Sequence, residues 1–140
     1  MKKYLQQIRI FDTRIRQKRD LYIEIRESAL SVGSIRYDKE QVQTSKSGDT
    51  LEKNVIRYLE LEEQLEKESE ELLNLKNKII NEIQSLDDDR FINILYKRYV
   101  EYKSYELIAV EMNYSFDYVK ELHRDALIKF KIKHPTLSHF

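Results

Sequence analysis

The chain has 140 residues, of which 36% are charged and 41% hydrophobic, with two glycines, one proline and no cysteine. This composition is typical of a helical protein rich in coiled coil, and the lack of cysteine excludes disulfides, thiolate catalysis and cysteine-based zinc sites. Lysine plus arginine equals aspartate plus glutamate, at 25 each. A net charge of zero argues mildly against a strong non-specific nucleic-acid binder, because such domains usually carry a net basic surface.

The sequence lacks the features of membrane insertion and secretion. No apolar run approaches the roughly 20 residues that a transmembrane helix needs. Near the start, Gln6, Gln7 and Arg9 interrupt any apolar core of a signal peptide. We therefore expect no membrane partner and a cytoplasmic location.

Residues 4–30 are predicted to form the first helix. Steps of three and four residues, the spacing of a heptad repeat, connect Ile8, Phe11, Ile15, Lys18, Tyr22, Ile25, Ala29 and Val32. Most arginines of this helix fall outside the stripe. They form either a basic face that binds nucleic acid or the solvated flank of a coiled coil, and we favour the flank because acidic residues are interleaved with them.

Residues 31–49 are predicted to form a flexible loop, with a transient turn around Tyr37. Both glycines and a cluster of serine, threonine, glutamine and lysine lie here, which is the composition of a loop. The two glycines are too far apart to form a phosphate-binding loop.

A second long helix is predicted to begin at a cap on Asp49 or Thr50 and to run to about Gln84. Seven-residue intervals connect Leu51, Tyr58, Leu65, Leu72, Ile79 and Leu86, with Val55, Leu61, Leu75 and Ile83 between them. A single helix cannot bury such a stripe. We therefore expect residues 1–85 to form an antiparallel coiled-coil hairpin, with the acidic residues 60–71 on a solvated face.

Three consecutive aspartates, 87–89, precede a predicted third helix over residues 90–102. They lack the spacing of a calcium loop, whereas Asp87 or Asp88 fits the N-cap of the helix. The apolar positions Phe91, Ile94 and Leu95, together with Tyr99, are expected to face inward.

Residues 104–130 have the pattern of two helices joined by a tight turn. Asn113 suits the left-handed conformation at the end of the first helix, and Ser115 suits the N-cap of the second. One apolar stripe runs along the second helix at Val119, Leu122, Ala126, Leu127 and Phe130. This pattern predicts a helix-turn-helix. Pro135 is expected to end the second helix and to leave a frayed tail at 134–140.

This helix-turn-helix resembles the DNA-binding fourth region of bacterial sigma factors. The residues that carry the resemblance are Ser104–Ile108, Ala109, Met112, Asn113, Ser115, Val119, Leu122, Ala126, Leu127 and Phe130. The preceding residues 91–100 resemble the leading helix of that region. The layout is similar to small phage-encoded regulators of Gram-positive bacteria, the sigma-like late regulators of the ArpU and RinA types. The resemblance implies an all-α fold, with a sigma-like domain at 86–133 after the hairpin.

The resemblance also implies a DNA-binding surface. Its residues are Lys103, Ser104, Tyr105, Ser115, Phe116, Asp117, Lys120, Glu121, His123 and Arg124. Phe116, Asp117, Lys120 and Glu121 fall on the base-facing positions, where sigma factors usually have Arg, Glu, Arg and Gln. The sequence keeps the acid and the second cation, and departs at Phe116 and Glu121.

No pattern of catalytic residues is present, so we expect neither an enzyme nor a cofactor, metal or small-molecule substrate. The resemblance implies a phage or prophage transcriptional regulator that binds double-stranded DNA in the host cytoplasm and acts on late genes with host RNA polymerase. Two alternatives stay open, a protein–protein interaction module without enzymatic activity and a small terminase-like DNA-packaging subunit. A homodimer also stays open.

Overall fold

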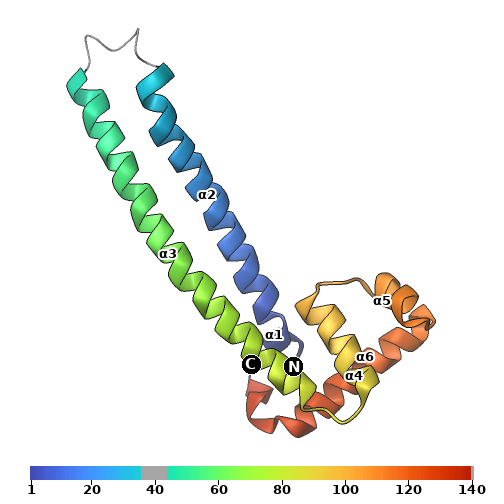
Figure 1. Ribbon diagram of the computed structural model, residues 1–140. Coiled ribbons are helices and arrows are strands. Elements are labelled where there is room, and N and C mark those ends of the chain that lie inside the picture. The colour runs from blue at the N-terminus through green and yellow to red at the C-terminus, as the bar shows by residue number, and fades with distance from the viewer. Residues whose placement is uncertain (36–43, 140) are drawn as a thin grey trace. The chain divides into compact units, whose positions relative to one another are not determined.

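The computed structural model describes residues 1–35 and 44–139, and all regular structure in this part of the chain is helical. The elements, labelled in Figure 1, are α1 (Lys2–Leu5), α2 (Gln7–Ile35), α3 (Thr44–Gln84), α4 (Asp89–Leu95), the π-helical turn η1 (Tyr96–Val100), α5 (Tyr105–Met112), α6 (Phe116–Lys133) and the 3-10 helix η2 (Pro135–His139). The expected all-α class is therefore confirmed.

The chain divides into two compact units. One consists of Met1–Asp12 together with Leu72–Phe140, and the other is Thr13–Glu71. These borders differ from the expected domains, 1–85 and 86–133. The cause is that residues from both ends of the chain are buried together in one core, which belongs to the unit Met1–Asp12 with Leu72–Phe140.

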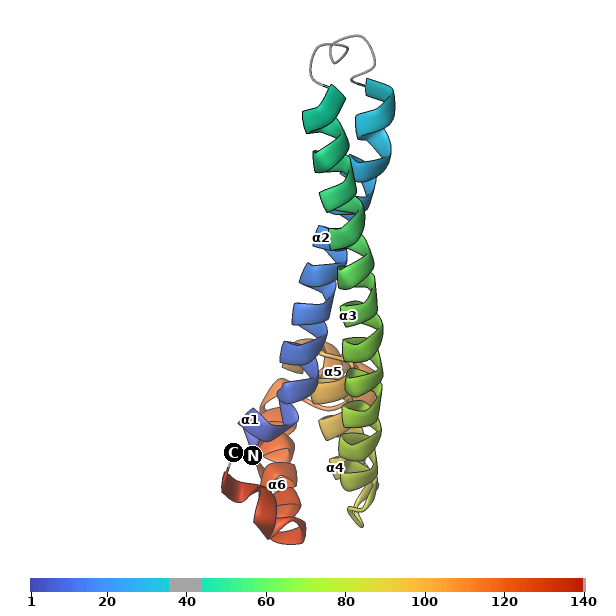
Figure 2. The ribbon, with the colours of Figure 1, turned by 90° about the vertical axis from the view of Figure 1, so that its left-hand side faces the viewer.

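In the unit Thr13–Glu71, α2 and α3 lie side by side and run in opposite directions (Figures 1 and 2). Lys18, the charged residue within the apolar stripe, donates a hydrogen bond from Nζ to Glu68 Oε1. The rings of Tyr22 and Tyr58 meet edge to face, with centroids 6.2 Å apart. A lysine within the stripe is thus accommodated by an ion pair from the facing helix.

The two long helices extend further than the sequence predicts. Helix α2 continues to Ile35 and α3 begins at Thr44, so the expected loop at 31–49 is too long and the expected cap at Asp49 or Thr50 is wrong. Each residue added to an existing helix gains a backbone hydrogen bond, and one interior glycine costs only about 1 kcal/mol relative to alanine. The expected turn around Tyr37 lies outside the described residues.

In the other unit, α4 and α5 both pack against α6. The largest fully buried side chains come from every part of this unit: Leu5, Ile8, Ile79, Ile83, Ile94, Leu95, Ile108, Val119 and Phe130. The ring of Tyr4 lies 6.2 Å from that of Phe130, and its hydroxyl donates to Glu82 Oε1 at 2.6 Å. The first residues of the chain are therefore part of the core that positions α6.

The segment before α5 is shorter and less regular than the predicted helix 90–102. Asp88 caps α4 as expected, since its Oδ1 accepts a hydrogen bond from the Arg90 backbone at 2.9 Å. After Leu95 the helix widens into the π-helical turn, and Tyr102 adopts a left-handed conformation with φ of 60°. The Tyr102 hydroxyl donates to Asp12 Oδ2 at 3.1 Å, so this turn is held by the beginning of α2.

The turn between α5 and α6 has the geometry that its sequence predicts. Ser104 Oγ accepts a hydrogen bond from the Leu107 backbone at 3.2 Å, and Ser115 Oγ accepts one from the Tyr118 backbone at 3.2 Å. Asn113 has a φ of 57° and a ψ of 42°, in the left-handed region. The expected N-cap at Ser115 and the expected left-handed Asn113 are confirmed, and the structure adds an N-cap at Ser104.

The residues after α6 are more ordered than the frayed tail expected at 134–140. Helix α6 does end just before Pro135, as expected, and the chain then forms η2. His134 Nε2 lies 3.0 Å from Ser85 Oγ and 3.1 Å from the backbone oxygen of Glu82. These contacts hold the end of α6 on the end of α3.

Candidate nucleic-acid interface

Helix α6 has one buried face and one exposed face. Val119, Leu122, Ala126 and Phe130 are at most 3% exposed. The exposed face over the first two and a half turns carries Phe116, Asp117, Lys120, Glu121 and Arg124. All five belong to the ten residues of the predicted DNA-binding surface, so the structure brings them together on one side of one helix.

The two cations of this exposed face are only weakly engaged by neighbouring residues. Lys120 Nζ lies 4.8 Å from the centroid of the Phe116 ring, within range of a cation–π contact. Arg124 lies 3.9 Å from a Glu121 oxygen and 3.8 Å from an Asp125 oxygen, and its side chain is 69% exposed. Exposed ion pairs at such distances contribute little, so a ligand can compete for both cations.

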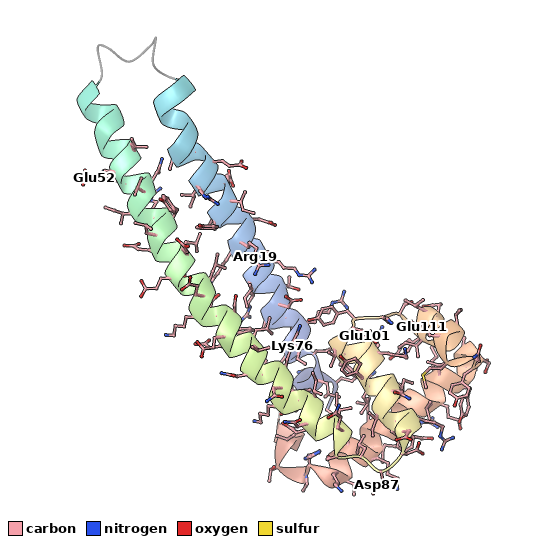
Figure 3. All side chains as sticks on the ribbon, in the orientation of Figure 1. Arg19, Glu52, Lys76, Asp87, Glu101 and Glu111 are labelled. Atoms are coloured by element: carbon pink, nitrogen blue, oxygen red, sulfur yellow. The ribbon has the colours of Figure 1, made fainter. Side chains whose placement is uncertain are left out.

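Lys103 is held in a different way from Lys120 and Arg124. Its Nζ donates to Glu111 Oε1 at 2.6 Å and to Oε2 at 2.8 Å, and it lies 3.4 Å from a Glu101 oxygen. Figure 3 shows Glu101 before α5 and Glu111 on α5. The hydrogen bond with Glu111 raises the pKa of Lys103 and lowers the pKa of Glu111. The positive charge expected to hold a phosphate is thus compensated within the protein.

The two serines of the predicted surface are used for capping. Ser104 and Ser115 are the N-caps of α5 and α6, and both remain exposed. Their side chains fix the starts of the two helices, which is a positioning role.

The sequence-based position of His123 on the DNA-facing side is wrong, because its side chain is only 3% exposed. Its Nε2 lies 2.7 Å from the Tyr99 hydroxyl and its Nδ1 lies 3.3 Å from the Tyr105 hydroxyl. Desolvation by burial lowers the pKa of His123 to about 4. The imidazole is therefore neutral near pH 7 and anchors two tyrosines.

A pocket of about 360 Å³ lies over His123, and we call it the His123 pocket. It is lined by Lys2, Tyr105, Lys120, His123, Arg124 and Leu127. The sequence indicated four of these residues as DNA-binding but gave no sign of Lys2. A basic start of a chain is a common feature, and no local pattern connects it to α6.

Arg98 contacts Tyr105, one of the residues that line the His123 pocket. Its guanidinium lies 4.2 Å from the centroid of the Tyr105 ring, and its Nη1 donates to the backbone oxygen of Lys103 at 2.9 Å. Arg98 also lines a smaller pocket of about 130 Å³ together with Gln6, Arg9, Ile10, Tyr99 and Tyr102.

Within residues 1–35 and 44–139, no group of three or more histidine, aspartate and glutamate side chains is arranged to hold a metal ion. No helix in the described part of the chain is long and apolar enough to cross a bilayer.

Comparison with known proteins adds no identification. No protein-family model matches the chain, and neither a curated protein nor a solved structure matches it.

Proposed function

We propose that the protein is a transcriptional regulator that binds double-stranded DNA with a helix-turn-helix formed by α5 and α6. The observation that carries this proposal is the two-sided character of α6. Its inner face is buried with Ile108 and Ala109 of α5, whereas the first turns of its outer face expose polar and aromatic side chains. In a helix-turn-helix, the N-terminal part of the second helix is the part that enters the major groove.

The outer face carries the chemistry that base recognition requires. A lysine donates to guanine, an aspartate accepts from the amino group of cytosine, and an aromatic ring contacts the methyl group of thymine. Lys120, Asp117 and Phe116 are exposed side by side on α6 and match these three roles. The capping serines hold the helix starts in place.

The resemblance to the sigma-like phage regulators extends the proposal. It adds host RNA polymerase as a partner, late genes as targets and a role without enzymatic activity. The paired α2 and α3 would be an antiparallel coiled-coil hairpin, a form suited to joining two copies of the chain. The ion pair of Lys18 with Glu68 supports specific pairing of these two helices.

The test is selection of duplexes from a random DNA library by the full-length protein, followed by fluorescence anisotropy with the selected sequence. Lys120→Gln should weaken binding, whereas Lys131→Gln should not. Lys131 is an exposed lysine on the same helix, about three turns beyond Lys120, and the change in charge is the same. Failure to enrich any duplex, alone or with RNA polymerase, would contradict the proposal.

A second candidate function is a protein–protein interaction module. It is favoured by large apolar side chains that stay exposed on the two helices: Leu107 and Val110 on α5, and Ile128 and Ile132 on α6. Val110 and Ile132 are 73% and 67% exposed. Binding of RNA polymerase without any enrichment of DNA would support this candidate over direct DNA binding.

A further inference from the structure

We propose that the His123 pocket binds a phosphate group of the DNA backbone through Lys2, Lys120 and Arg124, so that α1 is part of the DNA-binding surface. This inference rests on the proposed function and deepens it. The observation behind it is that Lys2, from the start of the chain, lines the same pocket as Lys120 and Arg124 of α6.

The charge of the pocket fits an anion. Three of its six lining residues are cations and none is a carboxylate. Of the acids on the same helix, Glu121 lies 3.9 Å and Asp125 lies 3.8 Å from Arg124, distances at which exposed ion pairs contribute little. Lys2 is close enough to His123 to disfavour a positive charge on the imidazole. Converging positive charges that are only weakly paired attract a phosphate.

The floor of the pocket adds a hydrogen-bond donor. The Tyr99 hydroxyl is buried, and burial raises the pKa of Tyr99, so this hydroxyl keeps its proton. When it donates to Nε2, the proton of the neutral imidazole is on Nδ1 and points to the Tyr105 oxygen. The hydroxyl proton of Tyr105 is then available to the pocket.

The donor is also held in position. The guanidinium of Arg98 lies 4.2 Å from the centroid of the Tyr105 ring, and the rings of Tyr105 and His123 meet edge to face with centroids 5.3 Å apart. An oriented hydroxyl beside converging cations loses little freedom when a phosphate binds. Phosphate contacts of this kind fix the position of a recognition helix on the duplex. The pocket would therefore set the register of α6 in the major groove.

The first experiment compares Lys2→Gln with Lys3→Gln in the full-length protein. Both lysines are exposed on α1 and each change removes one positive charge, but only Lys2 lines the pocket. DNA affinity is measured by anisotropy over a range of salt concentrations. Lys2→Gln should reduce the slope of log affinity against log salt by about one unit, as expected for one lost phosphate contact, and Lys3→Gln should leave the slope unchanged.

Because the pocket gives Lys120 a phosphate contact in addition to its base contact, Lys120→Gln should weaken binding to random duplexes as well as to the selected one; a loss on the selected duplex alone would remove Lys120 from the pocket. Equal slopes for wild type, Lys2→Gln and Lys3→Gln, with all three proteins folded, would overturn the pocket proposal while leaving DNA binding intact. The experiment can therefore contradict phosphate binding by the His123 pocket without contradicting DNA binding by the protein.

The second experiment needs no DNA. Inorganic phosphate is titrated into labelled protein, and the imidazole resonances of His123 and the ring resonances of Tyr105 are followed by NMR. Both should shift in wild type and in Lys3→Gln, and much less in Lys2→Gln. Shifts without any DNA binding would contradict the proposed function but support an anion site, whereas unchanged resonances in wild type would overturn the pocket.

Discussion

His123 lies between two tyrosine hydroxyls with 3% of its side chain exposed, so its imidazole loses hydration without gaining a compensating carboxylate. Desolvation is the first cause of its lowered pKa, and the nearby charges of Lys2 and Arg98 act in the same direction. A residue that the sequence placed among DNA contacts thus becomes a neutral support for Tyr99 and Tyr105.

This burial predicts how stability depends on pH. The folded pKa of His123 is about 4, below the value of about 6.5 in an unfolded chain, so the unfolded state binds more protons between these values. The free energy of unfolding should therefore decrease as pH falls from 6.5 to 4, by roughly 3 kcal/mol from this residue. Urea denaturation of wild type and His123→Gln should show the steeper decrease in wild type. Parallel curves would contradict the prediction.

Tyr99 and Tyr105 should contribute unequally to the free energy of unfolding. Tyr99→Phe removes the short contact of 2.7 Å and leaves a buried imidazole nitrogen without this partner, which should cost about 1–3 kcal/mol. Tyr105→Phe removes a longer contact of 3.3 Å from a half-buried hydroxyl and should cost less. Chemical denaturation of both variants measures the two losses of stability. A larger loss in Tyr105→Phe than in Tyr99→Phe would contradict the prediction.

At the scale of the element, the turn between α5 and α6 depends on one backbone conformation. Asn113 is left-handed and its backbone N–H reaches the carbonyl oxygens of Ala109 and Val110. Ser115 then starts α6 only three residues after α5 ends. The direction of α6, and with it the placement of Lys120 and Arg124, follows from this short turn.

Substitution of Asn113 tests that dependence. Asn113→Ala should destabilise the protein by roughly 1–2 kcal/mol, because a side chain with a Cβ and no local hydrogen bonding disfavours the left-handed region. Asn113→Gly should retain stability, since glycine adopts this conformation readily. The comparison is made by thermal denaturation. Equal losses in the two variants would indicate that the side chain, rather than the backbone conformation, is what matters.

At the scale of the whole molecule, the unit that contains α6 is built from both ends of the chain. Leu5 and Ile8 from the start, and Ile79 and Ile83 from the end of α3, are fully buried in it. A fragment that begins at residue 86, the domain border predicted from the sequence, would lack all four of these core residues. We therefore expect that the proposed DNA-binding module does not fold as a separate segment.

A fragment of residues 86–140 should lack a cooperative thermal transition, because its core would lose these apolar contacts to water. In the intact chain, Ile83→Ala should cost about 2–5 kcal/mol, and Ile56→Ala, at a position 48% exposed, should cost much less. Circular dichroism melts measure both. A cooperative melt of the fragment alone would contradict the shared core.

The sequence by itself determined the helical class, an aspartate cap at the start of α4, the cap at Ser115 and the left-handed Asn113. Each of these depends on residues within a turn or two of one another, where spacing and backbone preference act directly. It also indicated which side of α6 is apolar. The end of α2 and the start of α3 were mispredicted, because helix propagation continued through a segment whose composition favoured a loop.

Only the tertiary structure decided the character of the site. The pairing of Lys103 with Glu111, the burial of His123 under Tyr99 and the approach of Lys2 to Lys120 and Arg124 depend on how separate helices pack. A local pattern shows which face of a helix is apolar, but not which distant side chain lies beside it. The sequence specifies the helices, whereas the packing of those helices decides which of their cations are paired within the protein and which are not.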